Sequence, residues 1–175
     1  MKILVTGAKG FVGKNLCAQL KNIRDGKARC YGFVGKDSSA SPQNDSGLSI
    51  DEVFEYDLDS TPEELDAWCA AADFVFNLAG VNRPQNQEAF MEGNFGFAST
   101  LLDTLRKHGN RCPVMLSSSQ QASLAGRFGN SEYGRSKKAG EDLFLKYGEE
   151  IAGQAGNDGL SSCPAPTGHP GLRPR

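Results

Sequence analysis

Two kinds of hydrophobic pattern alternate along the chain, and each predicts a different element. Short continuous apolar runs predict strands at 2–6, 53–56, 74–78 and 113–116. Apolar residues at helical spacing predict helices at 11–23, 61–71, 86–108 and 131–148. Tyr31, Phe33 and Val34 suggest one more short strand, before a Gly/Ser/Pro/Asn/Asp-rich loop at 35–49. Because strands alternate with helices and are apolar on both faces, we expect an α/β fold with a doubly wound parallel sheet.

Three glycines follow the first predicted strand, at Gly7, Gly10 and Gly13. In a strand–turn–helix unit, the first glycine permits the sharp turn. The second lets the backbone approach a phosphate, and the third lets the helix pack against the strand. The helix that begins at Phe11 and Val12 points free N–H groups and its positive dipole end at an anion. The pattern therefore favours a dinucleotide pyrophosphate site, although such turns also occur for packing alone.

Two groups of polar residues later in the chain carry candidate chemistry. Tyr133 and Lys137 are four residues apart on a predicted helix, so they share one face, where an ammonium stabilises phenolate character. Ser119 ends a serine cluster after a predicted strand, where a hydroxyl can hold a substrate carbonyl. The alternative interpretations are a surface Tyr–Lys pair and a serine-rich turn or helix cap.

The order of these motifs resembles the extended short-chain dehydrogenase/reductase superfamily, whose members mostly act on nucleotide sugars. The resemblance assigns the glycine motif to 6–13 and the catalytic roles to Ser119, Tyr133 and Lys137. Tyr133 and Lys137 also belong to its cofactor-binding residues. The remaining cofactor-binding residues that it implies are Gly7, Gly10, Phe11, Val12, Gly13, Asp57, Leu58, Leu78, Ala79 and Gly80. Asn94 resembles the asparagine on the helix after the fourth strand, with the usual glycine displaced to Gly96.

Three stretches, 77–84, 117–122 and 133–137, resemble more closely the reductase domain of CapF-type enzymes of capsular polysaccharide biosynthesis. That resemblance implies NADPH-dependent reduction of the 4-keto group of a UDP-linked 6-deoxy-N-acetylhexosamine. Tyr133 would give its proton to the developing alkoxide, Lys137 would lower the pKa of Tyr133, and Ser119 would hold the carbonyl oxygen. A homodimer is a family expectation. A nucleotide-sugar epimerase or dehydratase and a non-catalytic dinucleotide-binding fragment are the alternatives.

The sequence leaves the choice between NAD(H) and NADP(H) open, although the resemblance favours NADP(H). If the strand before Asp57 is the second in the sheet, Asp57 or Asp59 binds the ribose 2′-hydroxyl and favours NAD. If it is the third, Asp57 and Leu58 approach the adenine instead. Lys36 is placed to accept a 2′-phosphate, and Arg83 to contact either a phosphate or the substrate.

Length, charge and cysteine content reduce the number of functional classes to consider. With 175 residues the chain suits one domain, and a net charge of −2 gives no basic footprint for nucleic acid or an anionic membrane. We find neither an apolar run of about 18 residues that would span a bilayer nor a signal-peptide layout, so a cytoplasmic location is expected. The five cysteines are odd in number and lack a CxxC motif, which favours neither a metal site nor a disulfide framework.

The composition changes after about Glu150. The last 25 residues contain five glycines and four prolines and no strand-like run. We therefore expect an NAD(P)-binding Rossmann domain at 1–150 and a disordered or non-native tail at 151–175. An abrupt change of this kind is typical of a frameshifted or prematurely ended reading frame. The C-terminal strands and the substrate-binding region of the family would then be missing, which leaves an exposed parallel sheet edge.

Overall fold

The computed structural model describes residues 1–28, 49–82, 86–123 and 131–157. The strand expected at 31–34 lies outside these residues, as do most of the loop at 35–49 and residues 158–175 of the expected tail. Lys36 and Arg83 also lie outside the described residues.

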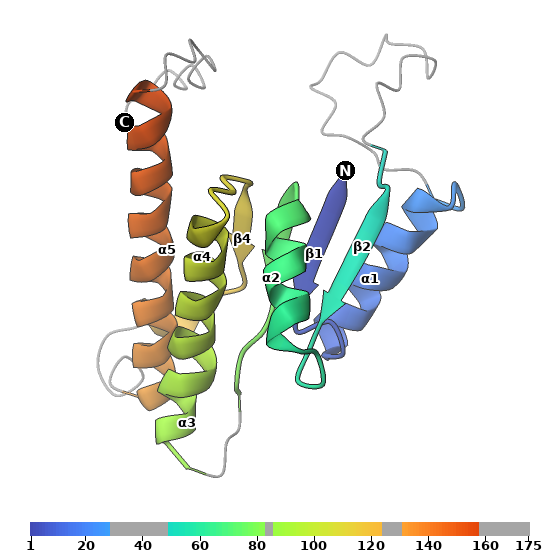
Figure 1. Ribbon diagram of the computed structural model, residues 1–175. Coiled ribbons are helices and arrows are strands. Elements are labelled where there is room, and N and C mark those ends of the chain that lie inside the picture. The colour runs from blue at the N-terminus through green and yellow to red at the C-terminus, as the bar shows by residue number, and fades with distance from the viewer. Residues whose placement is uncertain (29–48, 83–85, 124–130, 158–175) are drawn as a thin grey trace, which may run out of the picture.

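The described residues form a four-stranded parallel sheet (Figure 1). Its strands are β1 (Lys2–Thr6), β2 (Glu52–Tyr56), β3 (Phe74–Asn77) and β4 (Val114–Leu116), in the order β2-β1-β3-β4. Thr6 is in register with Tyr56 on one side and Asn77 on the other, so three strands end together. Among the described strands, the one that precedes Asp57 pairs directly with β1.

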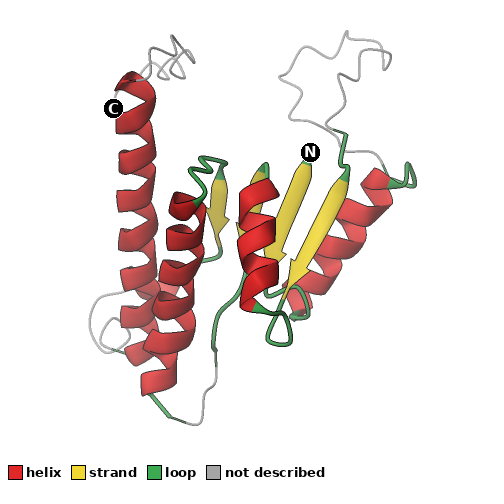
Figure 2. Cartoon of the chain, in the orientation of Figure 1, coloured by secondary structure: helices red, strands yellow, loops and turns green. Residues whose placement is uncertain are grey.

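Helices cover both faces of the sheet, as the apolar strands predict (Figure 2). Helix α1 (Phe11–Arg24) packs through Cys17 and Leu20 on the face that carries Ile3 and Val5 of β1. Leu4, the residue between them, points to the opposite face. There it meets the core formed with α2 (Pro62–Ala71), α4 (Phe97–Lys107) and α5 (Glu132–Asn157). The doubly wound architecture expected from the sequence is confirmed.

Local sequence signals fix where the helices begin. At α2, the Thr61 hydroxyl accepts a hydrogen bond from the Glu64 N–H, and the Glu64 carboxylate accepts one from the Thr61 N–H. At α1, the Gly10 backbone caps the helix without a side chain. The helix begins at Phe11 as predicted, but Phe11 and Val12 are 87% and 60% exposed, so these two members of the apolar pattern do not face the core.

Two predicted helices differ from the structure in detail. The helix expected at 86–108 is a continuous run of α3 (Glu88–Phe90), the π-helix η1 (Met91–Gly96) and α4. The helix expected to end near Gly148 continues as α5 to Asn157. A helical glycine costs only about 1 kcal/mol relative to alanine. The contacts of Tyr147 and Ile151 with the main core offset that cost.

Candidate active site

The glycine loop is held in a shape that larger residues would disturb. Gly7 has φ +70°, and a Cβ atom built on it would lie 2.8 Å from the backbone nitrogen of Ala79. A Cβ on Gly13 would lie 2.2 Å from the carbonyl oxygen of Gly7. The tight turn at Gly7 and the close packing at Gly13 are therefore both present, as the motif predicts.

A buried polar pair ties the loop to β3. The Thr6 hydroxyl donates to Oδ1 of Asn77 at 2.6 Å and accepts from the Ala79 N–H at 3.3 Å. Thr6 and Asn77 are both almost completely buried. The bond between them fixes the carboxyl ends of β1 and β3 relative to each other, and with them the backbone of the glycine loop.

A cavity of about 400 Å³ opens at the carboxyl ends of β1, β2 and β3. Seven of the predicted cofactor-binding residues line it: Gly7, Gly10, Asp57, Leu58, Leu78, Ala79 and Gly80. Gly13 lies behind the loop, and Phe11 and Val12 are not among the lining residues. This is the edge at which doubly wound sheets bind their ligands.

Two carboxylates, Asp57 and Asp59, follow the end of β2, and Asp57 lines the cavity. Asp57 accepts hydrogen bonds from the backbone N–H groups of Lys9 and Leu58, at 2.7 and 2.8 Å. Asp59 forms an ion pair with the Lys9 ammonium, which lowers the pKa of Asp59 and raises the pKa of Lys9. The Asp57 carboxylate is thus oriented by the glycine loop itself, while the charge of Lys9 is already paired.

Tyr133 and Lys137 lie on one face of α5, as their spacing predicts. The Lys137 ammonium is 5.9 Å from the centroid of the Tyr133 ring, and that ring also packs edge-on against Phe90. Burial lowers the pKa of Lys137, because the charged ammonium is partly removed from water. A Cβ atom on Gly80 would lie 3.0 Å from Nζ of Lys137. The ammonium therefore meets the lining of the cavity at Gly80.

Asn94 connects the loop after β3 to α5. Its side chain accepts from the Val81 N–H at 2.9 Å and donates to the Val81 carbonyl at 3.1 Å. It also donates to the buried Ser136 hydroxyl at 3.0 Å, and Ser136 in turn donates to the carbonyl of Tyr133. Asn94 sits in the π-helix η1, an element that often occurs at functional sites. This network positions the helix turn that carries Tyr133 against Gly80.

Ser119 precedes the short 3₁₀ helix η2 (Gln120–Ala122), which packs against α5. Its hydroxyl accepts a hydrogen bond from the Gln121 N–H at 3.3 Å, so Ser119 caps this helix. The two interpretations of the serine cluster are therefore compatible, because a capping hydroxyl still has its proton to donate. Lys137 donates to the carbonyl of Ser117, two residues earlier, at 3.3 Å.

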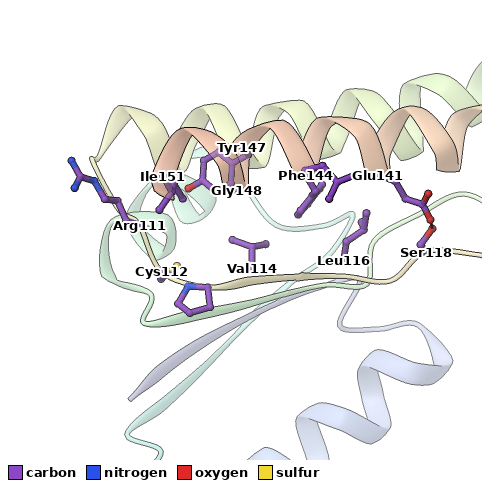
Figure 3. A pocket seen from close by; sticks show the side chains of 12 residues that line it. Arg111, Cys112, Val114, Leu116, Ser118, Glu141, Phe144, Tyr147, Gly148 and Ile151 are labelled. Carbon is purple, nitrogen blue, oxygen red and sulfur yellow. Dashed lines mark hydrogen bonds between the residues drawn. The ribbon is translucent and has the colours of Figure 1, made fainter. Parts of the chain in front are cut away.

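A second cavity, of about 590 Å³, lies between β4 and α5. Figure 3 shows Phe144, Tyr147 and Ile151 of the helix above Val114 and Leu116 of the strand. Within the described residues β4 pairs with β3 alone, so this cavity runs along a free sheet edge. Among the described strands, none pairs with the other side of β4.

Sequence reasoning did not find several polar contacts of this site. The Thr6–Asn77 bond carries a detectable signal, namely polar residues at the ends of two apolar strands. The bond between Ser118 and Glu141 carries another, because Glu141 continues the spacing of Tyr133 and Lys137 by four more residues. The place of Asn94 in a π-helix has no comparable signal in the local pattern.

The fold and the site together define an α/β protein with a doubly wound parallel sheet and a cavity beside its glycine loop, at the carboxyl ends of the strands. Residues 3–156 match the NAD dependent epimerase/dehydratase family, and the chain belongs to this family. In the part of the chain that the structure describes, no helix is both long and apolar enough to cross a membrane.

Two relatives are similar over most of the chain. UDP-2-acetamido-2,6-beta-L-arabino-hexul-4-ose reductase from Pseudomonas aeruginosa is 36% identical over 151 residues, which cover 86% of this chain and 32% of the relative. The capsular polysaccharide assembling protein CapF from Staphylococcus aureus has a TM-score of 0.59 and 35% identity, over 87% of this chain and 33% of that protein. The chain thus spans about a third of the length of these relatives.

A more distant structure shares the fold alone. A short-chain dehydrogenase/reductase superfamily protein from Agrobacterium tumefaciens, solved with bound NAD, has a TM-score of 0.59 and 20% identity. The match covers 84% of this chain and 45% of that protein. The parallel Rossmann-type sheet predicted from the sequence is confirmed by this likeness, and the extended short-chain dehydrogenase/reductase assignment is confirmed by the family match.

Proposed function

We propose that the chain is the cofactor-binding and catalytic part of a nucleotide-sugar reductase. Its substrate would be the 4-keto group of a UDP-linked 6-deoxy-N-acetylhexosamine. One observation carries this proposal: the cavity lined by the glycine loop reaches Gly80, where the Lys137 ammonium and the Asn94 amide meet. The Lys137 ammonium thus lies next to Gly80, which also lines the cavity of the glycine loop.

The residues around the cavity fit a nicotinamide dinucleotide. Gly7 and Gly10 leave their backbone uncovered beside the N-terminus of α1, where a pyrophosphate is stabilised by N–H groups and the helix dipole. Leu58 is fully exposed at the rim, and a nucleotide base would cover it. The names of the two relatives, a UDP-sugar reductase and a capsular polysaccharide assembling protein, support this proposal.

The catalytic residues would divide the work at the ketone carbon. Bound NAD(P)H supplies the hydride. Ser119 donates its hydroxyl proton in a hydrogen bond to the carbonyl oxygen, and Tyr133 transfers its phenolic proton to that oxygen as negative charge develops there. The Lys137 ammonium stabilises the resulting phenolate and binds the nicotinamide ribose. Its partial burial strengthens this electrostatic effect.

We further propose NAD(H) as the preferred cofactor, against the expectation from the resemblance. Asp57 follows the strand next to β1, and its carboxylate faces the N–H of Lys9 in the glycine loop. A carboxylate at this place accepts the 2′-hydroxyl of the adenosine ribose and repels a 2′-phosphate. Asp59 adds a second negative charge, and it already pairs with the nearby Lys9 ammonium.

A thermal-melting titration with NADH and NADPH tests cofactor binding directly. A ligand at 100 times its dissociation constant stabilises a protein by about 2.7 kcal/mol. We expect NADH to raise the melting temperature at lower concentration than NADPH. Asp57→Asn should reduce this difference, while Asp51→Asn, at a carboxylate remote from the loop, should not. A melting temperature unchanged by either cofactor would contradict the proposal.

Turnover tests the reaction. NADH consumption with a UDP-4-keto-6-deoxy sugar should be stoichiometric with product, whereas an epimerase would regenerate its cofactor. Tyr133→Phe should abolish turnover and leave the NADH-induced melting shift intact. Cofactor binding without any turnover in the parent chain would instead favour a non-catalytic dinucleotide-binding fragment.

A further inference from the structure

One side chain on the catalytic face of α5 has no role in the proposed reaction. Tyr133, Lys137 and Glu141 follow one another at intervals of four residues, so they lie on the same face of the helix. Oε1 of Glu141 accepts a hydrogen bond from the Ser118 hydroxyl at 2.5 Å. Figure 3 shows the two side chains meeting at one end of the cavity between β4 and α5.

Within the described residues, this contact is one of two hydrogen bonds that join Ser117–Ser119, here called the serine turn, to α5. The Lys137 ammonium donates to the Ser117 carbonyl at 3.3 Å, and Glu141 binds the next residue, Ser118. Two consecutive residues of the turn are therefore held by side chains from consecutive turns of the helix. The residue that follows them is Ser119, whose hydroxyl position depends on where this turn lies.

The hydrogen bonds that Glu141 and Lys137 make to the serine turn differ in strength, and only Lys137 has a second role in the proposed reaction. A hydroxyl bound to a carboxylate at 2.5 Å is charge-assisted, whereas 3.3 Å is long for an ammonium–carbonyl bond. In the proposed mechanism Lys137 binds the nicotinamide ribose, so its hydrogen bond with the Ser117 carbonyl need not persist when the cofactor binds. Glu141 does not neutralise Lys137 either, since burial alone accounts for the lowered pKa of that lysine.

We propose that Glu141 is a positioning residue that holds Ser119 in place relative to Tyr133 through its bond with Ser118. The assignment of a catalytic purpose to this contact rests on the proposed reductase function. The hydrogen bond between Glu141 and Ser118, and its effect on the serine turn, do not depend on that function.

Amide hydrogen exchange at Gln121 and Ala122 reports on the turn, because both N–H groups bond back to Ser119. Glu141→Ala and Ser118→Ala should each accelerate this exchange about tenfold, the ratio that corresponds to one lost charge-assisted hydrogen bond. The double variant should exchange no faster than either single variant. Glu141→Gln, which keeps an acceptor oxygen, should restore most of the protection.

Glu149→Ala is the matched control, since it makes the same substitution two turns further along α5. Unchanged exchange in Glu141→Ala, additive effects in the double variant, or an equal effect of Glu149→Ala would each overturn the proposal. Measurements of turnover then distinguish a failure of this proposal from a failure of the proposed reductase function. We expect Glu141→Ala to lower kcat about tenfold and to leave NADH affinity within twofold of the parent. If the parent chain binds NADH without turnover, the reductase function fails while the exchange data still decide the role of Glu141.

Discussion

The two ends of the sheet are built very differently. The cofactor half (β1, α1, β2 and the loop after β3) is closed: Leu4 and Val5 are inaccessible to solvent and Thr6 is buried against Asn77. The catalytic half (β4, η2 and α5) is open: no residue of β4 is buried, and Leu145 of α5 is 65% exposed. Both halves nevertheless carry the polar groups that their proposed roles need.

This difference shows that cofactor binding and catalysis make different demands on the structure. The cofactor half depends on close backbone packing, which the residues of the described sheet supply by themselves. The catalytic half depends on side chains held by a few hydrogen bonds on a helix and a turn beside a free edge. Binding of a dinucleotide should therefore survive in this chain more readily than catalysis, and substitutions in the two halves should have effects of different size.

The largest effect is expected at Gly7. Gly7→Ala introduces a Cβ at φ +70° and within 2.8 Å of the Ala79 backbone, so we expect a loss of at least about 3 kcal/mol in unfolding free energy. Gly26→Ala is the matched control, with the same φ but no atom within 4 Å, and should cost about 1 kcal/mol. Urea unfolding measures both, and equal losses would show that close packing of the loop does not matter.

A smaller loss is expected when the bond between β1 and β3 is removed. Thr6→Val keeps the shape but leaves Asn77 and the Ala79 N–H without their buried partner, which should cost about 2 kcal/mol. Thr100→Val removes an exposed hydroxyl that bonds within its own helix, and should change stability by less than about 0.5 kcal/mol. Similar values for both variants, measured by thermal and urea unfolding, would contradict the closed character of the cofactor half.

The smallest effect has the opposite sign and lies in the catalytic half. Burial lowers the pKa of Lys137 below its unfolded value, so the charged lysine costs stability at all pH values below the folded pKa. As the pH rises from the folded to the unfolded pKa, that cost disappears and stability rises. Lys137→Met should therefore stabilise the chain at pH 7 by less than about 1 kcal/mol and remove this alkaline rise.

Lys138→Met is the control for that measurement. Its ion pair with Asp142 raises the pKa of Lys138, so the charged form stabilises the fold, and that contribution is lost as the pH rises through the folded pKa. Lys138→Met should thus lower stability slightly at pH 7. A decrease in both variants would show that Lys137 is held by favourable contacts and bears no cost of burial.

The elements that sequence predicts well are those set by neighbouring residues. The strand at 2–6 and the turn at Gly7 follow from an apolar run that meets a glycine motif, and Thr61 with Glu64 marks the start of α2. The face shared by Tyr133 and Lys137 follows from helical spacing alone. These signals are local, so they need no knowledge of the rest of the chain.

The features that sequence misses depend on partners far along the chain. The Thr6–Asn77 bond, the π-helix around Asn94 and the extension of α5 past Gly148 each result from tertiary packing. The exposure of Phe11 and Val12 is a related case, because helical spacing alone does not show which residues of the first turn the rest of the fold covers. The proposal of a cofactor preference also required the order of the described strands, in which Asp57 follows the strand beside β1.

The central position of β1 has a consequence for synthesis of the protein. This strand leaves the ribosome before the other described strands, yet its two neighbours are β2 and β3, which are translated much later. Parallel pairing of this kind delays folding, because distant segments must meet before any ladder forms. During that interval the nascent chain presents the apolar run 3–5 with both edges free, a segment that chaperones would need to shield.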